Sequence, residues 1–334
     1  MSDWNSFLSS QTSAATINDD FDPQNTYLIP LTQQGLLSIK GPDAIKFLQG
    51  QVTCDVRELA DNHTRLGAQC NIKGRMLLCF LALQTEPEQV FLRIDKGLVA
   101  NGLASLGKYI VFSKAKLTDA TDTYRHIGIA GPNASKIIKD VFDLELEADN
   151  TWHSSQNHLI IRINEHRYEC WLNPEQAESI WQQAAKQTVI GNTNLWTLLN
   201  IQAGLGDITP ETFETFTPQA INFQLVNGIN FRKGCYTGQE IVARLHYRGT
   251  LKRHMYRFEF AATGDLPKPG SELKNAAGKS VGEIVIAAKK NAQSGELLAS
   301  VADDQRVDIY LPDNPQKLGL LPLPYAIPTP NEDE

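Results

Sequence analysis

Runs of apolar residues along the chain predict strands more often than helices. NTYLIPLTQQGLLSIKG (25–41) is typical of two strands around a Gln-Gln-Gly turn, and the following GPDAIKFLQG favours a short helix with Pro42 at its start. The run MLLCFLAL (76–83) is too short to span a membrane and is typical of a buried strand. Further segments complete the pattern: strands near 66–72, 89–94, 158–163 and 167–172, and helices near 96–107, 174–187 and 195–204.

One pattern occurs twice, ninety residues apart. SIKGPDAIKFL (38–48) resembles GIAGPNASKII (128–138), so that a strand, a Gly-Pro step and a helix follow one another in both stretches. We interpret this as a pseudo-repeat of two α+β units. Chance similarity is the alternative, because Gly-Pro-Asx-Ala is a common way to begin a helix.

The pattern changes after residue 254. Short strands punctuated by Gly and Pro follow, without a helical period, and they predict a separate small β-barrel or sandwich. The first 25 residues are rich in Ser, Thr and Asp and are expected to be loosely ordered. We therefore expect three parts: a loosely ordered N-terminus (1–25), a region of two intertwined α+β domains (26–250) and a C-terminal β-barrel (251–334).

Composition and charge exclude several classes of protein. The 334 residues are 42% hydrophobic and 21% charged, which is ordinary for a globular protein. The N-terminus has no Lys or Arg before residue 40, which argues against a signal or transit peptide. The five cysteines are scattered without a C-x-x-C pair, so we expect a cytoplasmic protein with no disulfide framework and no metal site.

The net charge of −7 argues against a generic nucleic-acid binder. Seven basic residues and one acid nevertheless lie between Arg232 and Arg257, which gives this stretch a charge of +6. A basic island in an acidic chain suggests a specific anionic ligand, and a solvated surface is the alternative.

FRKGCYTGQEIVARLHYRG (231–249) contains the main candidate for chemistry. Glycines on both sides of Cys235 would let a ligand approach closely, and the preceding Arg-Lys pair would favour the thiolate. No histidine follows at a short fixed spacing, although His246 could approach in space, so a Cys–His hydrolase is not indicated. Glu240 could accept from the ring N–H of a heterocycle, or pair with Arg244 if the segment is helical. Cys235 is either a functional thiol or a cysteine in a tight turn.

This segment resembles the signature of the YgfZ family, bacterial relatives of mitochondrial iron–sulfur assembly factors. Five stretches fit in order, one of which includes the start of this segment: FLQGQVTCDV (47–56), KGRML (73–77), KYIVFSKAKL (108–117), FTPQAINFQLVNGINFRKGCYTGQE (216–240) and LPLPYA (321–326). The motif K-G-C-[FY]-x-G-Q-E is matched at every position by Lys233, Gly234, Cys235, Tyr236, Gly238, Gln239 and Glu240.

The resemblance implies an α+β fold like that of the glycine-cleavage aminomethyltransferase, with a C-terminal β-barrel. It also implies a tetrahydrofolate-binding accessory protein that supports assembly or repair of iron–sulfur enzymes, among them a radical methylthiolase that modifies tRNA. Trp196 matches a position associated with folate and could stack on a flat pterin, with simple packing in the core as the alternative. A second such position falls at Gln34, which has no aromatic ring but could hydrogen-bond the pterin edge. The basic island would suit the carboxylates of a folate tail.

Two other functions are alternatives to this one. In aminomethyltransferases the KGRML segment is replaced by Gly-Gly and paired aspartates, whereas this chain has Leu77 and Leu78, which cannot handle a substrate amine. Direct tRNA binding would use Tyr236, Tyr247 and Tyr256 among the basic residues, but the acidic net charge disfavours it. A single thiolate cannot hold an iron–sulfur cluster alone. The sequence thus favours an accessory protein over an enzyme.

Overall fold

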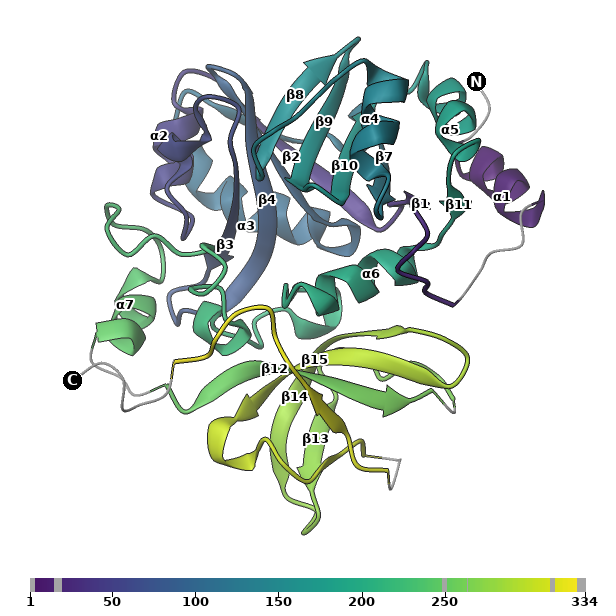
Figure 1. The fold of residues 1–334 in the computed structure, drawn as a ribbon. Helices are drawn as coiled ribbons and strands as arrows, with labels where there is room; N and C mark the ends of the chain where they lie inside the picture. The colour runs from purple at the N-terminus through teal and green to yellow at the C-terminus, as the bar shows by residue number, and fades with distance from the viewer. Residues whose placement is uncertain (1–3, 15–19, 248–250, 263, 313–315, 329–334) are drawn as a thin grey trace.

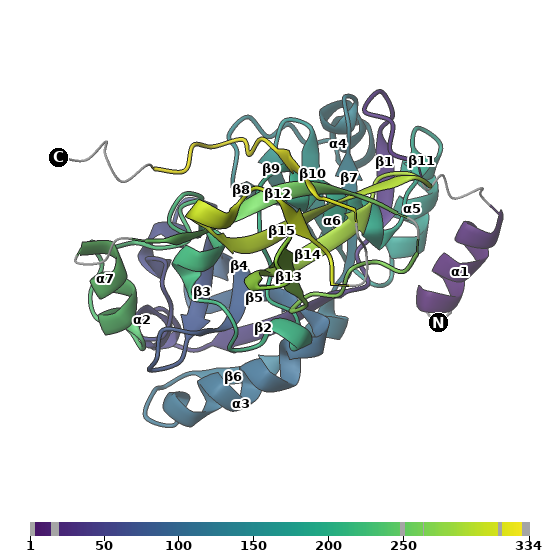
Figure 2. The ribbon, with the colours of Figure 1, turned by 90° about the horizontal axis from the view of Figure 1, so that it is seen from below.

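The computed structural model describes residues 4–14, 20–247, 251–262, 264–312 and 316–328. Two sheets stand side by side above the helix α6 (Thr193–Gln202), and a third sheet lies below it (Figure 1). Seen from below, the third sheet crosses the other two, with the helix α7 (Gln239–Tyr247) at one end of the molecule and α1 (Trp4–Ala14) at the other (Figure 2).

The first sheet is antiparallel and has the strand order β3-β4-β5-β2-β6. The helix α3 packs on one of its faces, where Gly102 lies against Leu37, Leu78 and Ile94. Its elements are β2 (Gln34–Lys40), α2 (Ala44–Gln49), β3 (Thr64–Cys70), β4 (Met76–Glu86), β5 (Gln89–Asp95), α3 (Val99–Ile110) and β6 (Lys116–Asp119).

The second sheet has the order β11-β1-β7-β10-β9-β8 and is antiparallel except for the β1–β11 pair. A core of apolar residues joins one face of it to α1, α4 and α5, and a smaller apolar cluster joins the other face to the first sheet. Its elements are β1 (Tyr27–Pro30), β7 (Arg125–Ala130), α4 (Ala134–Phe142), β8 (Thr151–Ser155), β9 (His158–Asn164), β10 (Arg167–Leu172), α5 (Ala177–Ala185) and β11 (Val189–Ile190).

The two strands predicted around the Gln-Gln-Gly turn both form, but they belong to different sheets. β1 pairs with β7, whereas β2 pairs with β5 and β6. The two similar stretches adopt the same conformation at their Gly-Pro steps, because Gly41 and Gly131 have φ of 141° and 135°. A Cβ at either glycine would lie 2.3 Å from a backbone carbonyl oxygen, so a side chain is excluded at both.

The N-terminus differs from the expected loose order, because residues 4–14 form the helix α1. Trp4, Phe7 and Leu8 are spaced for one helix face. Phe7 and Leu8 are buried, and Trp4 meets the ring of Trp181 edge-on with 6.1 Å between ring centroids. A few apolar residues at helical spacing thus hold this otherwise polar segment against the core that includes α5.

The C-terminal region is a β structure, as predicted, and consists of one curled antiparallel sheet. Its order is β16-β13-β14-β15-β12-β17, and it encloses its own apolar core, which includes Phe258, Leu273 and Leu297. Its strands are β12 (Arg253–Ala261), β13 (Glu272–Asn275), β14 (Ser280–Lys289), β15 (Ser294–Ala302), β16 (Ile309–Tyr310) and β17 (Gly319–Leu321).

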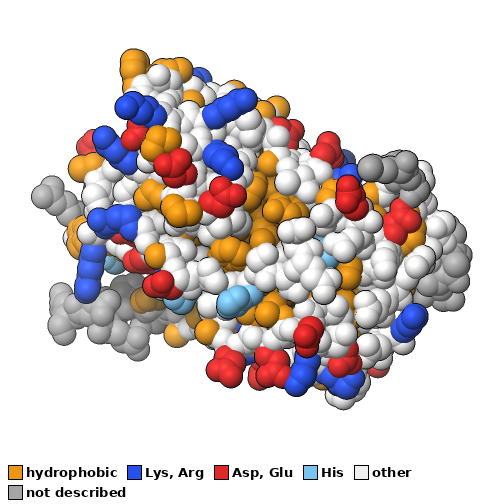
Figure 3. Space-filling view, turned by 90° about the horizontal axis from the view of Figure 1, so that it is seen from above, with side chains coloured by type: hydrophobic (Ala, Val, Ile, Leu, Met, Phe, Trp, Pro, Cys, Tyr) orange, Lys and Arg blue, Asp and Glu red, His pale blue; other side chains and the backbone are white. Residues whose placement is uncertain are grey.

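Two surface properties bear on partners. None of the helices in the described part of the chain has the length and apolar character needed to cross a membrane. Seen from above, charged side chains of both signs are spread around an apolar middle (Figure 3). That face therefore has no continuous basic surface of the kind that binds nucleic acid.

Candidate functional site

Polar side chains meet between the first two sheets, in a region that is otherwise apolar. They come from β2, β5, β7, β10 and α6. We call this group the inter-sheet cluster; it consists of Gln34, Arg93, His126, Arg167, Glu169 and Trp196.

Glu169 is at the centre of the cluster and is fully buried. Its Oε1 accepts a hydrogen bond from Trp171 Nε1 at 2.8 Å and lies 3.3 Å from Arg93 Nε. A buried carboxylate is stable only when it is paired in this way. Arg93 and Glu169 therefore form an ion pair that links the two sheets.

Trp196 packs between a glycine and an arginine. A Cβ at Gly128 would lie 2.4 Å from the indole, so the glycine makes room for the ring. The guanidinium carbon of Arg167 lies 4.0 Å from the ring centroid, which is a cation–π contact. Arg167 also donates to Asn200 Oδ1 at 2.6 Å, and burial lowers its pKa to about 9. Trp196 is 2% exposed and Arg167 5%, so both side chains are buried in the cluster.

Gln34 lies in the same cluster, as a partner of a histidine. Its Oε1 is 2.9 Å from Nδ1 of His126, whose ring stacks on Trp171 with 5.0 Å between centroids. Burial lowers the pKa of His126 to about 4, so the imidazole is neutral at physiological pH and donates from Nδ1 to Gln34.

The cluster has buried polar atoms that the described residues do not satisfy. Glu169 Oε2, Arg167 Nε and His126 Nε2 have no hydrogen-bond partner in the described part of the chain. Buried groups of this kind normally find a partner. Arg167 also lines a cleft of about 550 Å³, together with Leu199 and Gln202, and this volume is within the range of small-molecule sites. Within the cluster, Arg167 is the residue that lines this cleft, whereas Gln34 and His126 line a separate pocket of about 100 Å³.

Next to Arg93, the structure assembles an acidic group that the sequence did not reveal. Cys79 Sγ lies 2.8 Å from Asp207 Oδ1, and burial raises the pKa of both groups. Burial, and then the nearby charge of Asp207, raises the pKa of Asp95 to about 6. These residues are separated by up to 128 positions in the chain, so no local motif could have indicated their proximity.

The loop before α7 is held in place by Lys233. Its ammonium donates to the carbonyl oxygens of Val52 and Cys54, both at 2.6 Å, and lies 5.2 Å from the Tyr236 ring centroid. Lys233 is 6% exposed, and burial lowers its pKa to about 8. The lysine therefore anchors the loop to the segment after α2.

Cys235 is the exposed cysteine among five whose other members are all buried. Gly234 beside it has open space around its Cα, whereas Gly238 has φ of +83° and lies against Asn71 O, where a Cβ would be 2.5 Å away. Gln239 and Glu240 begin α7, and Glu240 is exposed. The motif thus presents one thiol to solvent on a fixed backbone.

The basic island does not act as a unit. Lys233 binds backbone carbonyls, and Arg257 pairs with the buried Glu296 at 2.6 Å. Arg232, Arg244 and Lys252 are exposed. The island therefore does not gather around the inter-sheet cluster.

The sequence brought Cys235 and Trp196 into one hypothesis, but the structure places them on different elements. The Cys235 loop leads into α7 at one end of the molecule, whereas Trp196 is on the central helix α6 (Figures 1 and 2). Leu77 and Leu78 are buried in β4, as apolar residues should be. Among the described residues, no group of three His, Cys, Asp or Glu side chains could hold a metal ion.

Comparison with known proteins agrees with this architecture. The model of the GCVT N-terminal domain matches residues 24–226. The glycine cleavage system aminomethyltransferase T from Bartonella henselae superposes with a TM-score of 0.68 at 16% identity, over 89% of this chain and 84% of that one, which shows a common fold.

Several curated relatives have a higher sequence identity to this chain than that structure has. The tRNA-modifying protein YgfZ of Photorhabdus laumondii is 34% identical over 309 residues, which are 90% of this chain and 92% of the relative. The protein of the same name from Pectobacterium carotovorum is 33% identical over 310 residues, with the same coverage. An uncharacterized protein of Haemophilus influenzae is 36% identical over 247 residues, 74% of this chain and 78% of its own length. With its motif intact and its length matched, the chain belongs to the YgfZ family, within the proteins that contain the GCVT N-terminal domain.

Proposed function

We propose that this protein binds tetrahydrofolate and supports assembly or repair of iron–sulfur enzymes, and that it affects tRNA modification through such a client. The relatives' name, tRNA-modifying protein, supports a place in that process. A radical methylthiolase that acts on tRNA is the type of client we propose. Direct RNA contact is not required, and the mixed charges in Figure 3 give it no support.

The unsatisfied atoms of the inter-sheet cluster are the observation that carries the folate proposal. A pterin has N–H donors on one edge and carbonyl and ring-nitrogen acceptors on another. Glu169 Oε2 could accept from the former and Arg167 Nε could donate to the latter. Arg167 would meet the pterin at the cleft that it lines, and Trp196 would support its guanidinium through the cation–π contact. His126 and Gln34 line a separate pocket of about 100 Å³ and would take part only through the cluster. The cluster therefore offers hydrogen-bonding groups of the kinds that a pterin needs.

Cys235 is proposed as the group that acts on the client. An exposed thiol on an anchored loop can reach the surface of another protein, and thiolates are natural ligands of iron. One cysteine cannot complete a cluster site, so the remaining ligands would come from the client or from a small thiol. We further propose that residues 26–250 form two repeated α+β domains and that 251–334 form a third.

The pair Asp95 and Asp207 supports a second candidate, aminomethyl transfer to or from tetrahydrofolate. A carboxyl with a pKa of about 6 suits proton transfer at neutral pH. The purified protein would then transfer the methylene carbon of an aminomethyl donor to tetrahydrofolate, forming methylenetetrahydrofolate and releasing ammonia and the unsubstituted donor, and Asp207→Asn would abolish these products. The accessory role predicts no such product.

Folate binding is tested by titrating intrinsic tryptophan fluorescence with tetrahydrofolate. Glu169→Gln, which removes the charge and keeps the size, should weaken binding at least tenfold, because charge-assisted hydrogen bonds contribute about 1.5–3 kcal/mol. Glu147→Gln, on an exposed segment, is the matched control and should bind as the wild type does. Equal affinity of Glu169→Gln and wild type would contradict the site.

The role of the thiol is tested in cells that lack the endogenous protein. Cys235→Ala should lower the activity of radical iron–sulfur enzymes, while the purified variant keeps its folate affinity. Cys170→Ala alters a buried cysteine and should retain client activity to the extent that it folds. Full complementation by Cys235→Ala would make the thiol dispensable.

A further inference from the structure

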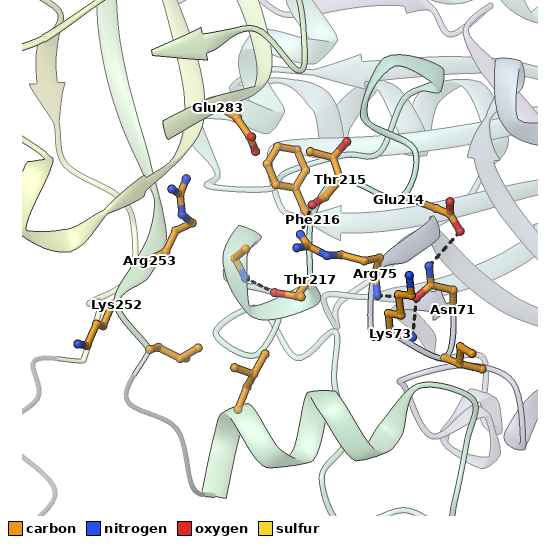
Figure 4. Close-up of a pocket in the computed structure, with 14 residues that line it drawn as sticks. Asn71, Lys73, Arg75, Glu214, Thr215, Phe216, Thr217, Lys252, Arg253 and Glu283 are labelled. Atoms are coloured by element: carbon orange, nitrogen blue, oxygen red, sulfur yellow. Dashed lines mark hydrogen bonds between the residues drawn. The ribbon is translucent and has the colours of Figure 1, made fainter. Parts of the chain in front are cut away.

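A second and larger cavity lies away from the inter-sheet cluster. Its volume is about 1020 Å³, and it opens between the β3–β4 turn, the segment 214–217 and the start of β12. Figure 4 shows its two sides, with Lys73 and Arg75 on one and Lys252 and Arg253 on the other. We call it the basic cleft.

The two arginines are held in place by carbonyl oxygens. Arg75 donates from one terminal nitrogen to Thr215 O, and Arg253 donates from one to Ser300 O at 3.0 Å. Each guanidinium has further N–H groups beyond this bond. Both side chains are exposed toward the cleft, so their remaining donors can reach a ligand.

Lys73 and Lys252 add two flexible cations, one on each side of the cleft. Glu214 and Glu283 also line it, so the charged side chains of the lining sum to +2. Glu214 is engaged as an acceptor, because Asn71 Nδ2 donates to its Oε1 at 2.9 Å. Cations thus dominate both sides.

We propose that the basic cleft binds an extended polyanion, a ligand with several phosphate or carboxylate groups along a chain. The volume of about 1020 Å³ is at the upper end of the range for small-molecule sites, so it suits a large ligand. A single small anion would fill only a small part of it. The guanidinium group of arginine can donate two parallel hydrogen bonds to the oxygens of a carboxylate or a phosphate. Ile72, which is 78% exposed, and Leu245 supply apolar surface for the chain between the charges.

The position of the cleft connects it to the Cys235 loop. The β3–β4 turn that carries Lys73 and Arg75 packs against this loop at Gly238, whose Cβ position is 2.5 Å from Asn71 O, and Gly74 of the turn packs against Ile241 of α7. An occupant of the cleft therefore binds to the turn on which the loop rests. The proposal is independent of folate binding at the inter-sheet cluster.

Two probes separate the possible sources of negative charge. Binding of tripolyphosphate and of a γ-linked pentaglutamate is measured by calorimetry on the full chain at low and at physiological salt. We expect at least one probe to bind, and its affinity to fall severalfold with added salt. The double variant Lys73→Glu, Lys252→Glu should weaken that binding at least tenfold. The probe that binds more tightly identifies phosphate or carboxylate as the preferred group.

Lys186→Glu is the control for charge reversal at one site, because Lys186 is exposed beyond α5, outside the cleft. Two further single variants, Lys73→Ala and Lys252→Ala, keep the test valid if the double charge reversal does not fold. We expect each alanine variant to weaken binding about threefold and the control to change it less than twofold. Absence of binding to both probes, or an equal loss in Lys186→Glu, would overturn the proposal.

Discussion

Asp95 offers a quantitative test of the acidic group next to Arg93. Burial and the neighbouring Asp207 raise the pKa of its carboxyl from 3.8 to about 6, so the folded protein favours the protonated form. At pH 7 the carboxyl is ionised in both states, and its ionised form costs the folded state about 3 kcal/mol at most. Because Asp95 is only half-buried, solvent screening reduces the expected cost to about 1–2 kcal/mol.

Asp95→Asn should therefore raise the free energy of unfolding at pH 7 by that amount. Asparagine can keep the hydrogen bond that Oδ1 accepts from Gly97 N at 2.7 Å. The gain should fall as the pH is lowered, to roughly a third at pH 4.5, because the wild-type carboxyl then becomes protonated on folding. Urea unfolding at both pH values measures it, with the exposed Asp304→Asn as control. A gain that is absent at pH 7, or that does not change with pH, would refute the reasoning.

Two further variants test the packing of the cluster and the loop. Gly128→Ala should lower the free energy of unfolding by about 2 kcal/mol or more, because its Cβ would lie 2.4 Å from the Trp196 ring. Gly107 lies in α3 with open space around it, so Gly107→Ala is the control. In the same urea titration this control should be neutral or stabilising by up to about 1 kcal/mol. Lys233→Met should cost about 2–4 kcal/mol, because two buried carbonyl oxygens lose their donor, whereas Cys235→Ser should change stability by less than about 0.5 kcal/mol. A Lys233→Met variant as stable as the wild type would contradict the anchoring role.

The strands and helices of this fold are predictable from local pattern because their apolar periods are regular. The assignment of β1 and β2 to different sheets is not, since β1 pairs with β7, about a hundred residues away, and β2 pairs with β5, about fifty to sixty residues away. The sequence pattern did not indicate α1 because its large apolar residues are confined to the first turns, and the partner of Trp4, Trp181, is distant in sequence.

The candidate site likewise has one part that the sequence predicts and one part that only the folded structure reveals. Cys235 and its motif are contiguous, so their resemblance to a family could be seen at once, and Trp196 and Gln34 followed from it. Arg93, Glu169 and His126 come from three strands and carry no motif that sets them apart. Their importance follows from burial and pairing, which only the folded chain reveals.

Lys233 has a consequence for how this motif is studied by mutation. A cell-based screen would record a loss at Lys233 and a loss at Cys235 as the same phenotype, although one variant removes two hydrogen bonds between the loop and the segment after α2 and the other removes only a sulfur atom. Melting temperatures would separate the two, because, of these two side chains, it is the lysine that bonds the backbone. Reactivity should therefore be assigned within this motif only to positions whose variants melt like the wild type.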